Sequence, residues 1–151
     1  MFIETLLVAA LVVAALFNIQ PTDSGVRLGS SGVREAPSDR DNWVEAYRSA
    51  QIVYYANTGT VRKSGRQRTR MWRMTDYKIS QINGEFVYTS KKTLEEYDCN
   101  IGRVRLLYTA LYDGHMGQGE PLFTQSETYA WEDVQLDTGM AAMWRIACNR
   151  E

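Results

Sequence analysis

The alternation of apolar and polar residues predicts a series of strands from residue 43 onward. Runs rich in β-branched and aromatic residues are separated by turn-forming residues, and residues 103–112 form the clearest of these runs. Asn83-Gly84 is typical of a tight hairpin turn, because both residues tolerate positive φ angles. Residues 113–119 are rich in glycine and predict another turn. We therefore expect strands within the segments 43–47, 52–55, 60–62, 66–74, 77–82, 85–88, 90–99, 103–112 and 121–134, the last in one or two pieces.

The apolar period changes near the C-terminus, where it predicts one short helix. Met140, Met143, Trp144 and Ala147 recur at helical spacing and make one apolar face, which favours core packing over a ligand site. Asp137 precedes this run and is a plausible N-cap, so the helix is expected to begin just after it.

The N-terminal part of the chain has a different character. Residues 6–17 are an uninterrupted apolar run, shorter than the roughly 20 residues that cross a bilayer. The run has the length of the hydrophobic region of a secretory signal, and Val13-Ala14-Ala15 suits cleavage, although Glu4 replaces the usual basic residue. We predict a signal peptide or N-terminal anchor at residues 1–17, with a buried core helix as the alternative. Residues 18–42 have the composition of a flexible linker, which leaves a folded domain at 43–151.

Composition adds two limits on the function. The 151 residues carry a net charge of -1, so a strong overall field toward nucleic acid is not expected. Nine tyrosines and four tryptophans are abundant for this length, and both residue types suit strands and half-buried binding surfaces.

Cys99 and Cys148 are the two cysteines of the chain. One ends a predicted strand and the other ends the predicted helix, so we expect a disulfide that fastens the helix to the sheet. The alternatives are two free thiols or a metal pair, but a metal would need further ligands, and the chain has one histidine. A disulfide fits an exported protein, because such bonds persist in oxidising compartments.

No residue pattern indicates an active site, a cofactor or a metal. His115 is the single histidine, which excludes a histidine metal cluster, and it is expected to be exposed in a turn. Glu95, Glu96 and Asp98 are close together, but adjacent carboxylates on opposite strand faces do not form an acid–base pair. We expect them at a solvated strand edge. The Gly117–Gly119 segment lacks the strand–loop–helix context of a phosphate site.

The candidate ligand-binding residues are Arg66, Arg68, Arg70 and Trp72, which two-residue alternation places on one strand face. This stripe has two possible interpretations. It is either a site for an anionic partner, or a solvated face whose arginines discourage edge-to-edge aggregation.

Over about residues 43–148, the sequence resembles the surface-adhesin protein E family of exported bacterial proteins. The residues that carry the resemblance are Tyr88-Thr89-Ser90-Lys91-Lys92, Glu96-Tyr97-Asp98-Cys99, Arg103, Arg105, Leu111-Tyr112-Asp113, Gly117-Gln118-Gly119, Trp131, Asp137 and Ile146-Ala147-Cys148. The resemblance implies an α+β fold, mainly β, in which an antiparallel sheet of about six strands has a C-terminal helix tethered to its concave face by the disulfide. It also implies a binding protein of the cell envelope, with host extracellular-matrix and plasma proteins as partners of the best-known branch. That branch is lipid-anchored through an N-terminal cysteine, whereas this chain has no cysteine before Cys99.

The sequence thus predicts a non-enzymatic, exported binding domain of the cell envelope, in the periplasm or at the cell surface. Its expected partners are extracellular-matrix or other proteins, or anionic polymers, and it meets a membrane only through the N-terminal segment. The alternative is a periplasmic envelope protein with a structural or stress-related role and no host ligand.

Overall fold

The computed structural model describes residue 36 and residues 42–149. The predicted signal or anchor at 1–17 and nearly all of the predicted linker lie outside the described residues. Within the described part, the chain forms an antiparallel sheet of seven strands, a single turn of 3-10 helix and one α-helix.

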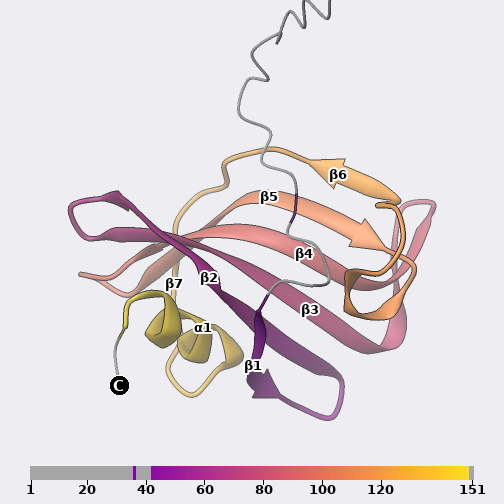
Figure 1. Cartoon of the computed structure of the whole chain (residues 1–151), viewed down its shortest axis with the longest axis horizontal. Helices are drawn as coiled ribbons and strands as arrows, with labels where there is room; N and C mark the ends of the chain where they lie inside the picture. Colours follow the sequence, from indigo (N-terminus) through magenta and orange to yellow (C-terminus); the bar gives the residue numbers. More distant parts are fainter. Residues whose placement is uncertain (1–35, 37–41, 150–151) are drawn as a thin grey trace, which may run out of the picture. The chain divides into compact units, whose positions relative to one another are not determined.

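The sheet is a meander in which consecutive strands pair (Figure 1). Six strands follow the order β1-β2-β3-β4-β5-β6. The short strand β7 pairs with the edge of β5 that also carries β6, but at the beginning of β5, whereas β6 pairs near its end. The strands are β1 (Trp43–Arg48), β2 (Ile52–Gly65), β3 (Arg68–Asn83), β4 (Phe86–Asp98), β5 (Arg103–Tyr112), β6 (Phe123–Gln125) and β7 (Glu132–Asp133). The mainly β antiparallel fold predicted from the sequence is confirmed.

The strands are longer than the sequence predicted. The segments 66–74 and 77–82 belong to the single strand β3, which starts at Arg68, and 52–55 continues through 60–62 in β2. Bulges explain the apparent breaks, since the pairing register shifts between Asn57 and Arg62 and between Asp76 and Gln81. The predicted hairpin turn is confirmed at Gly84, which has a φ of 60°.

The helix α1 (Gly139–Ala147) begins one residue later than predicted. Thr138 is the N-cap: its backbone is extended, and its side chain accepts a hydrogen bond from the Ala141 amide at 3.2 Å. The prediction of Asp137 as the cap is wrong, because Asp137 has a φ of 60° and lies in the left-handed region rather than the extended one an N-cap needs.

The main core lies between α1 and one face of the sheet, where α1 packs against β1, β2 and β3. Met71 and Tyr97 of the sheet are fully buried there with Met143 of the helix, and Val104 and Ala147 complete the contact. The core-packing role predicted for Met143 is therefore confirmed. Met71 of β3, which follows Arg70 in the predicted stripe segment, belongs to this core and not to the surface.

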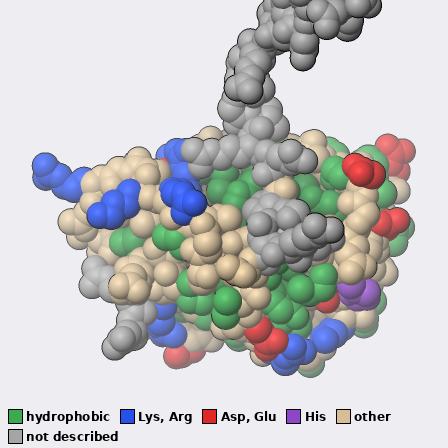
Figure 2. Space-filling model, in the orientation of Figure 1, with side chains coloured by type: hydrophobic (Ala, Val, Ile, Leu, Met, Phe, Trp, Pro, Cys, Tyr) green, Lys and Arg blue, Asp and Glu red, His purple; other side chains and the backbone are tan. Residues whose placement is uncertain are grey.

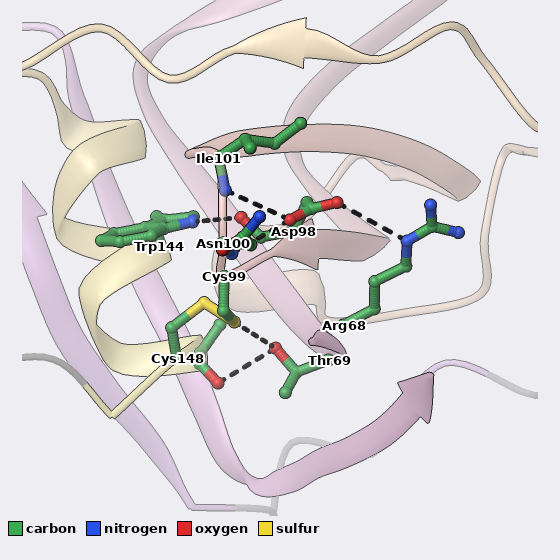
Figure 3. The surroundings of a disulfide bond; sticks show 9 residues. Arg68, Thr69, Asp98, Cys99, Asn100, Ile101, Trp144 and Cys148 are labelled. Atoms are coloured by element: carbon green, nitrogen blue, oxygen red, sulfur yellow. Dashed lines mark hydrogen bonds and ion pairs between the residues drawn. A yellow bond between two sulfur atoms is a disulfide. The ribbon is translucent and has the colours of Figure 1, made fainter. Parts of the chain in front are cut away.

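The predicted disulfide is present and joins the end of α1 to the end of β4 (Figure 3). Cys99 and Cys148 are bonded, with their Cα atoms 5.5 Å apart, which excludes the free-thiol and metal-pair alternatives. Two hydrogen bonds lie beside it: Thr69 Oγ1 donates to the Ala147 carbonyl at 3.0 Å, and Trp144 Nε1 donates to the Asp98 carbonyl at 2.9 Å. The C-terminal helix is thus fastened to two strands.

Across the residues that the structure describes, we find no helix with the length and apolar character needed to cross a bilayer.

Candidate binding surfaces

An exposed group of cations lies at the β2–β3 hairpin. Arg62, Lys63, Arg66 and Arg68 are all exposed there, and we call these four residues the basic end. Figure 2 shows lysines and arginines gathered at the end of the domain where Figure 1 draws this hairpin. A hollow of about 390 Å³ lies beside it, lined by Gly65, Arg66, Gln67, Arg68, Asp98 and Asn100. A single carboxylate, that of Asp98, faces this hollow.

The structure divides the predicted arginine stripe into exposed and internal parts. Arg66 is in the hairpin turn and Arg68 opens β3, so both face solvent. Arg70 is half-buried and its Nε lies 2.9 Å from Glu96 Oε1. Trp72 is only 4% exposed and packs edge-on against Tyr108, with ring centroids 5.5 Å apart. Arg68 and Arg70 share one strand face as predicted, but Trp72 presents almost no surface to a partner.

Two residues outside the predicted stripe, Trp131 and Arg105, lie beside it. Trp131 lies under two guanidinium groups, those of Arg68 at 5.1 Å and Arg105 at 4.5 Å from its ring centroid. Arg105 also pairs with Glu96, at 2.5 Å between Nη2 and Oε2. Sequence reasoning did not select either residue as a site residue. The alternation of residues 103–105 placed Arg105 on a strand face, but its pairing with Glu96 depends on the register between β4 and β5.

Glu95 and Glu96 are buried, so the prediction that they lie at a solvated edge is wrong. They are 3% and 2% exposed, because β4 is a central strand with both of its faces covered. As predicted, they occupy opposite faces: Glu96 meets Arg70 and Arg105, whereas Glu95 pairs with Arg73 at 2.6 Å. Asp98, at the strand end, is partly exposed and lies 3.6 Å from Arg68.

Hydrogen bonding keeps Glu96 ionised despite its burial. Burial by itself raises the pKa of Glu96. Hydrogen bonds from Ser64, Arg105 and Arg70 lower the pKa by more than burial raises it, so the pKa lies below the ordinary value for a glutamate. An ionised carboxylate bound by two arginines is a structural anchor, which does not have the raised pKa expected of a general acid.

A cavity of about 410 Å³ lies on the sheet face that carries α1, and we call it the polar cavity. Arg73 and Glu95 form its buried ion pair, and the Arg73 guanidinium lies 4.6 Å from the centroid of the Tyr54 ring. Its lining residues are Tyr54, Arg73, Lys91, Thr93, Glu95, Val104, Arg105, Leu106, Tyr129, Ala130, Glu132 and Met140. This second candidate surface was not predicted, since its residues come from six separate segments of the chain.

His115 is exposed in the β5–β6 connection, inside the short 3-10 turn His115–Gly117. Its Nδ1 lies 3.1 Å from Asp76 Oδ1, which also accepts a hydrogen bond from the Met116 amide. The Gly117 amide donates to Ser90 Oγ at 2.8 Å, so this turn is bonded to the sheet. Among residues 36 and 42–149, no group of three or more His, Cys, Asp or Glu residues is arranged to hold a metal ion.

Fold and surfaces together define a disulfide-braced antiparallel β-sheet domain with a basic end and a polar cavity. Residues 43–149 match the model of the family described as Surface-adhesin protein E, and this chain belongs to that family. The family resemblance inferred from the sequence is confirmed. No curated protein matches the sequence as a relative.

Solved structures with a similar fold come from Haemophilus influenzae. Crystal form II of its protein E is 12% identical with a TM-score of 0.57, and the match covers 77% of this chain and 97% of that chain. A structure of protein E from a non-typeable strain is 16% identical with a TM-score of 0.56, and the match covers 77% of this chain and 82% of that chain. At this level of identity the likeness establishes the fold.

Proposed function

We propose that this chain is a non-enzymatic, exported binding domain of the cell envelope that recognises an anionic surface of a protein or polymer through its basic end. The observation that carries the proposal is the concentration of exposed cations on one hairpin. Arg62, Lys63, Arg66 and Arg68 face solvent around a hollow that one carboxylate lines. A local field of this kind attracts anions even though the net charge of the chain is -1.

The basic end is held by rigid neighbours, which supports a binding role. The Cys99 amide donates to the Gln67 carbonyl at 2.8 Å, so the hairpin turn is bonded directly to a disulfide cysteine. Thr69, two residues further along, is bonded to the end of α1. A surface ordered before binding loses less conformational entropy when a partner docks, so these contacts favour affinity.

Export is supported by two features. The disulfide is the kind of bond that persists outside the reducing cytosol. The apolar run at residues 6–17 has the length of a secretory signal region, although it lies outside the described residues.

The test is binding to immobilised heparin, a polyanion used as a probe. The double variant Lys63→Glu/Arg66→Glu should elute at clearly lower salt than the unchanged protein, because two exposed cations become anions. The matched control, Lys78→Glu/Arg145→Glu, makes the same change of net charge at two exposed positions elsewhere. Equal elution of the two double variants would show that total charge, rather than the basic end, governs binding, and would overturn the proposal.

One observation favours the alternative of a structural role in the periplasm. Arg70 and Arg105 are engaged by Glu96, and Trp131 packs on Arg105, so this part of the arginine face is satisfied internally. Protease treatment of intact cells separates the two functions. A binding domain that acts outside the cell is cleaved, whereas a periplasmic protein is protected until the outer membrane is opened.

A further inference from the structure

The polar cavity has the size and lining of a small-molecule site, independently of the basic end. Its volume of about 410 Å³ lies in the usual range for ligand pockets. Val104, Leu106 and Met140 supply apolar lining, and Tyr129 adds an aromatic ring. Arg73, Lys91 and Glu95 supply charged groups. Apolar walls with a few convergent polar groups are the common composition of sites for small organic ligands.

The charges in the cavity do not balance. Arg73 and Glu95 neutralise each other at 2.6 Å, and the Tyr97 hydroxyl also donates to Glu95. Lys91 is the additional cation: its ammonium lies 5.8 Å from the Tyr77 ring centroid, and within the described residues it has no carboxylate at ion-pair distance. The other charged lining groups are engaged or exposed, since Arg105 pairs with Glu96, and Glu132 faces solvent.

Two further features concern how completely the cationic groups of the cavity are satisfied. Burial lowers the pKa of Lys91, and the nearby Arg73 guanidinium lowers it as well, so the charged form is held at a cost. Arg73 is 8% exposed, and its Nε is buried without a hydrogen-bond partner in the described part of the chain. A buried donor without a partner and a desolvated ammonium are both stabilised by an added anion.

We propose that the polar cavity binds a small organic monoanion, a carboxylate or sulfonate with an aromatic or aliphatic body. The anionic group pairs with the Lys91 ammonium. The body packs against the apolar and aromatic lining residues Leu106, Tyr129 and Met140.

The test uses two fluorescent probes with the same body. 8-Anilinonaphthalene-1-sulfonate carries the anionic group, and N-phenyl-1-naphthylamine lacks it. The folded protein should bind the sulfonate probe more tightly than the neutral probe. Lys91→Met, which removes the charge and keeps most of the stem, should weaken sulfonate binding by about tenfold or more and leave neutral-probe binding unchanged. Lys78→Met, at an exposed lysine outside the lining, is the matched control.

A second pair of variants tests the location without removing a charge. Ala130 is exposed and lines the cavity, so Ala130→Phe should fill it and block both probes. Thr128→Phe places the same ring on an exposed residue of the same segment outside the lining and should leave binding unchanged. Circular dichroism and urea midpoints confirm that each variant is folded. The proposal is overturned if the unchanged protein does not bind the sulfonate probe, if Lys91→Met does not weaken it, or if the two phenylalanine variants behave alike.

Discussion

Removing the disulfide should lower the stability of the domain by a large and calculable amount. The perturbation is the double variant Cys99→Ser/Cys148→Ser, which leaves both side chains nearly the same size. The two cysteines are 49 positions apart, and closing a loop of that length reduces the entropy of the unfolded chain. The chain-entropy relation values this at roughly 4 kcal/mol at 25 °C. A loss of this size lowers the melting temperature of a domain this small by roughly 20 °C.

The remaining contacts decide whether the helix stays docked. Thr69 still donates to the Ala147 carbonyl and Trp144 to the Asp98 carbonyl. Each such hydrogen bond contributes about 1 kcal/mol net, so the pair does not replace the lost link. The fully buried Met143 keeps its contacts with the sheet. We therefore expect a folded but much weaker domain at 25 °C.

Urea unfolding followed by tryptophan fluorescence measures the difference, because Trp144 lies beside the disulfide. The unchanged protein in reductant should coincide with the double variant, and reductant should not alter the double variant itself. The reasoning is refuted if the unfolding free energy of the double variant falls within about 1 kcal/mol of that of the oxidised protein, since that change is no larger than an average substitution produces.

Three other changes follow from the packing, each measured as the free energy of unfolding in urea. Glu96→Gln should cost roughly 2–4 kcal/mol, because two arginines lose their buried carboxylate. The folded-state pKa of Glu96 lies below its unfolded value of 4.5. The ionised carboxylate therefore stabilises the fold above pH 4.5, and this stabilisation is lost as the pH falls through the folded-state pKa. Glu96→Gln should accordingly lose less stability on acidification than the unchanged protein does. Thr138→Ala should cost about 1 kcal/mol, and more than Asp137→Asn, because Thr138 alone caps the helix and asparagine tolerates a positive φ. Gly139→Ala should cost about 1–3 kcal/mol despite the better helix propensity of alanine, since its Cβ would lie 2.6 Å from a ring carbon of Tyr54.

The sequence by itself determined the parts of this protein that depend on neighbouring residues. Apolar–polar alternation predicts which residues share a strand face, and it correctly separated Glu95 from Glu96. Asn83-Gly84 specified a turn because of its backbone preferences, and helical spacing placed Met143 in the core. A chain with two cysteines has a single possible intramolecular disulfide, so that bond followed from their number and setting.

The tertiary structure alone decided what covers each face. Glu96 is a charged residue of β4 and Trp72 an amphipathic residue of β3, and both are buried. The sequence does not show this burial, because it is produced by neighbouring strands and by segments that come later in the chain. The Glu96–Arg105 pair required the register between two strands, and the polar cavity required residues from six segments. The physical reason is that alternation is a local property of the backbone, whereas burial, ion pairing and cavities arise from contacts between residues far apart in the chain.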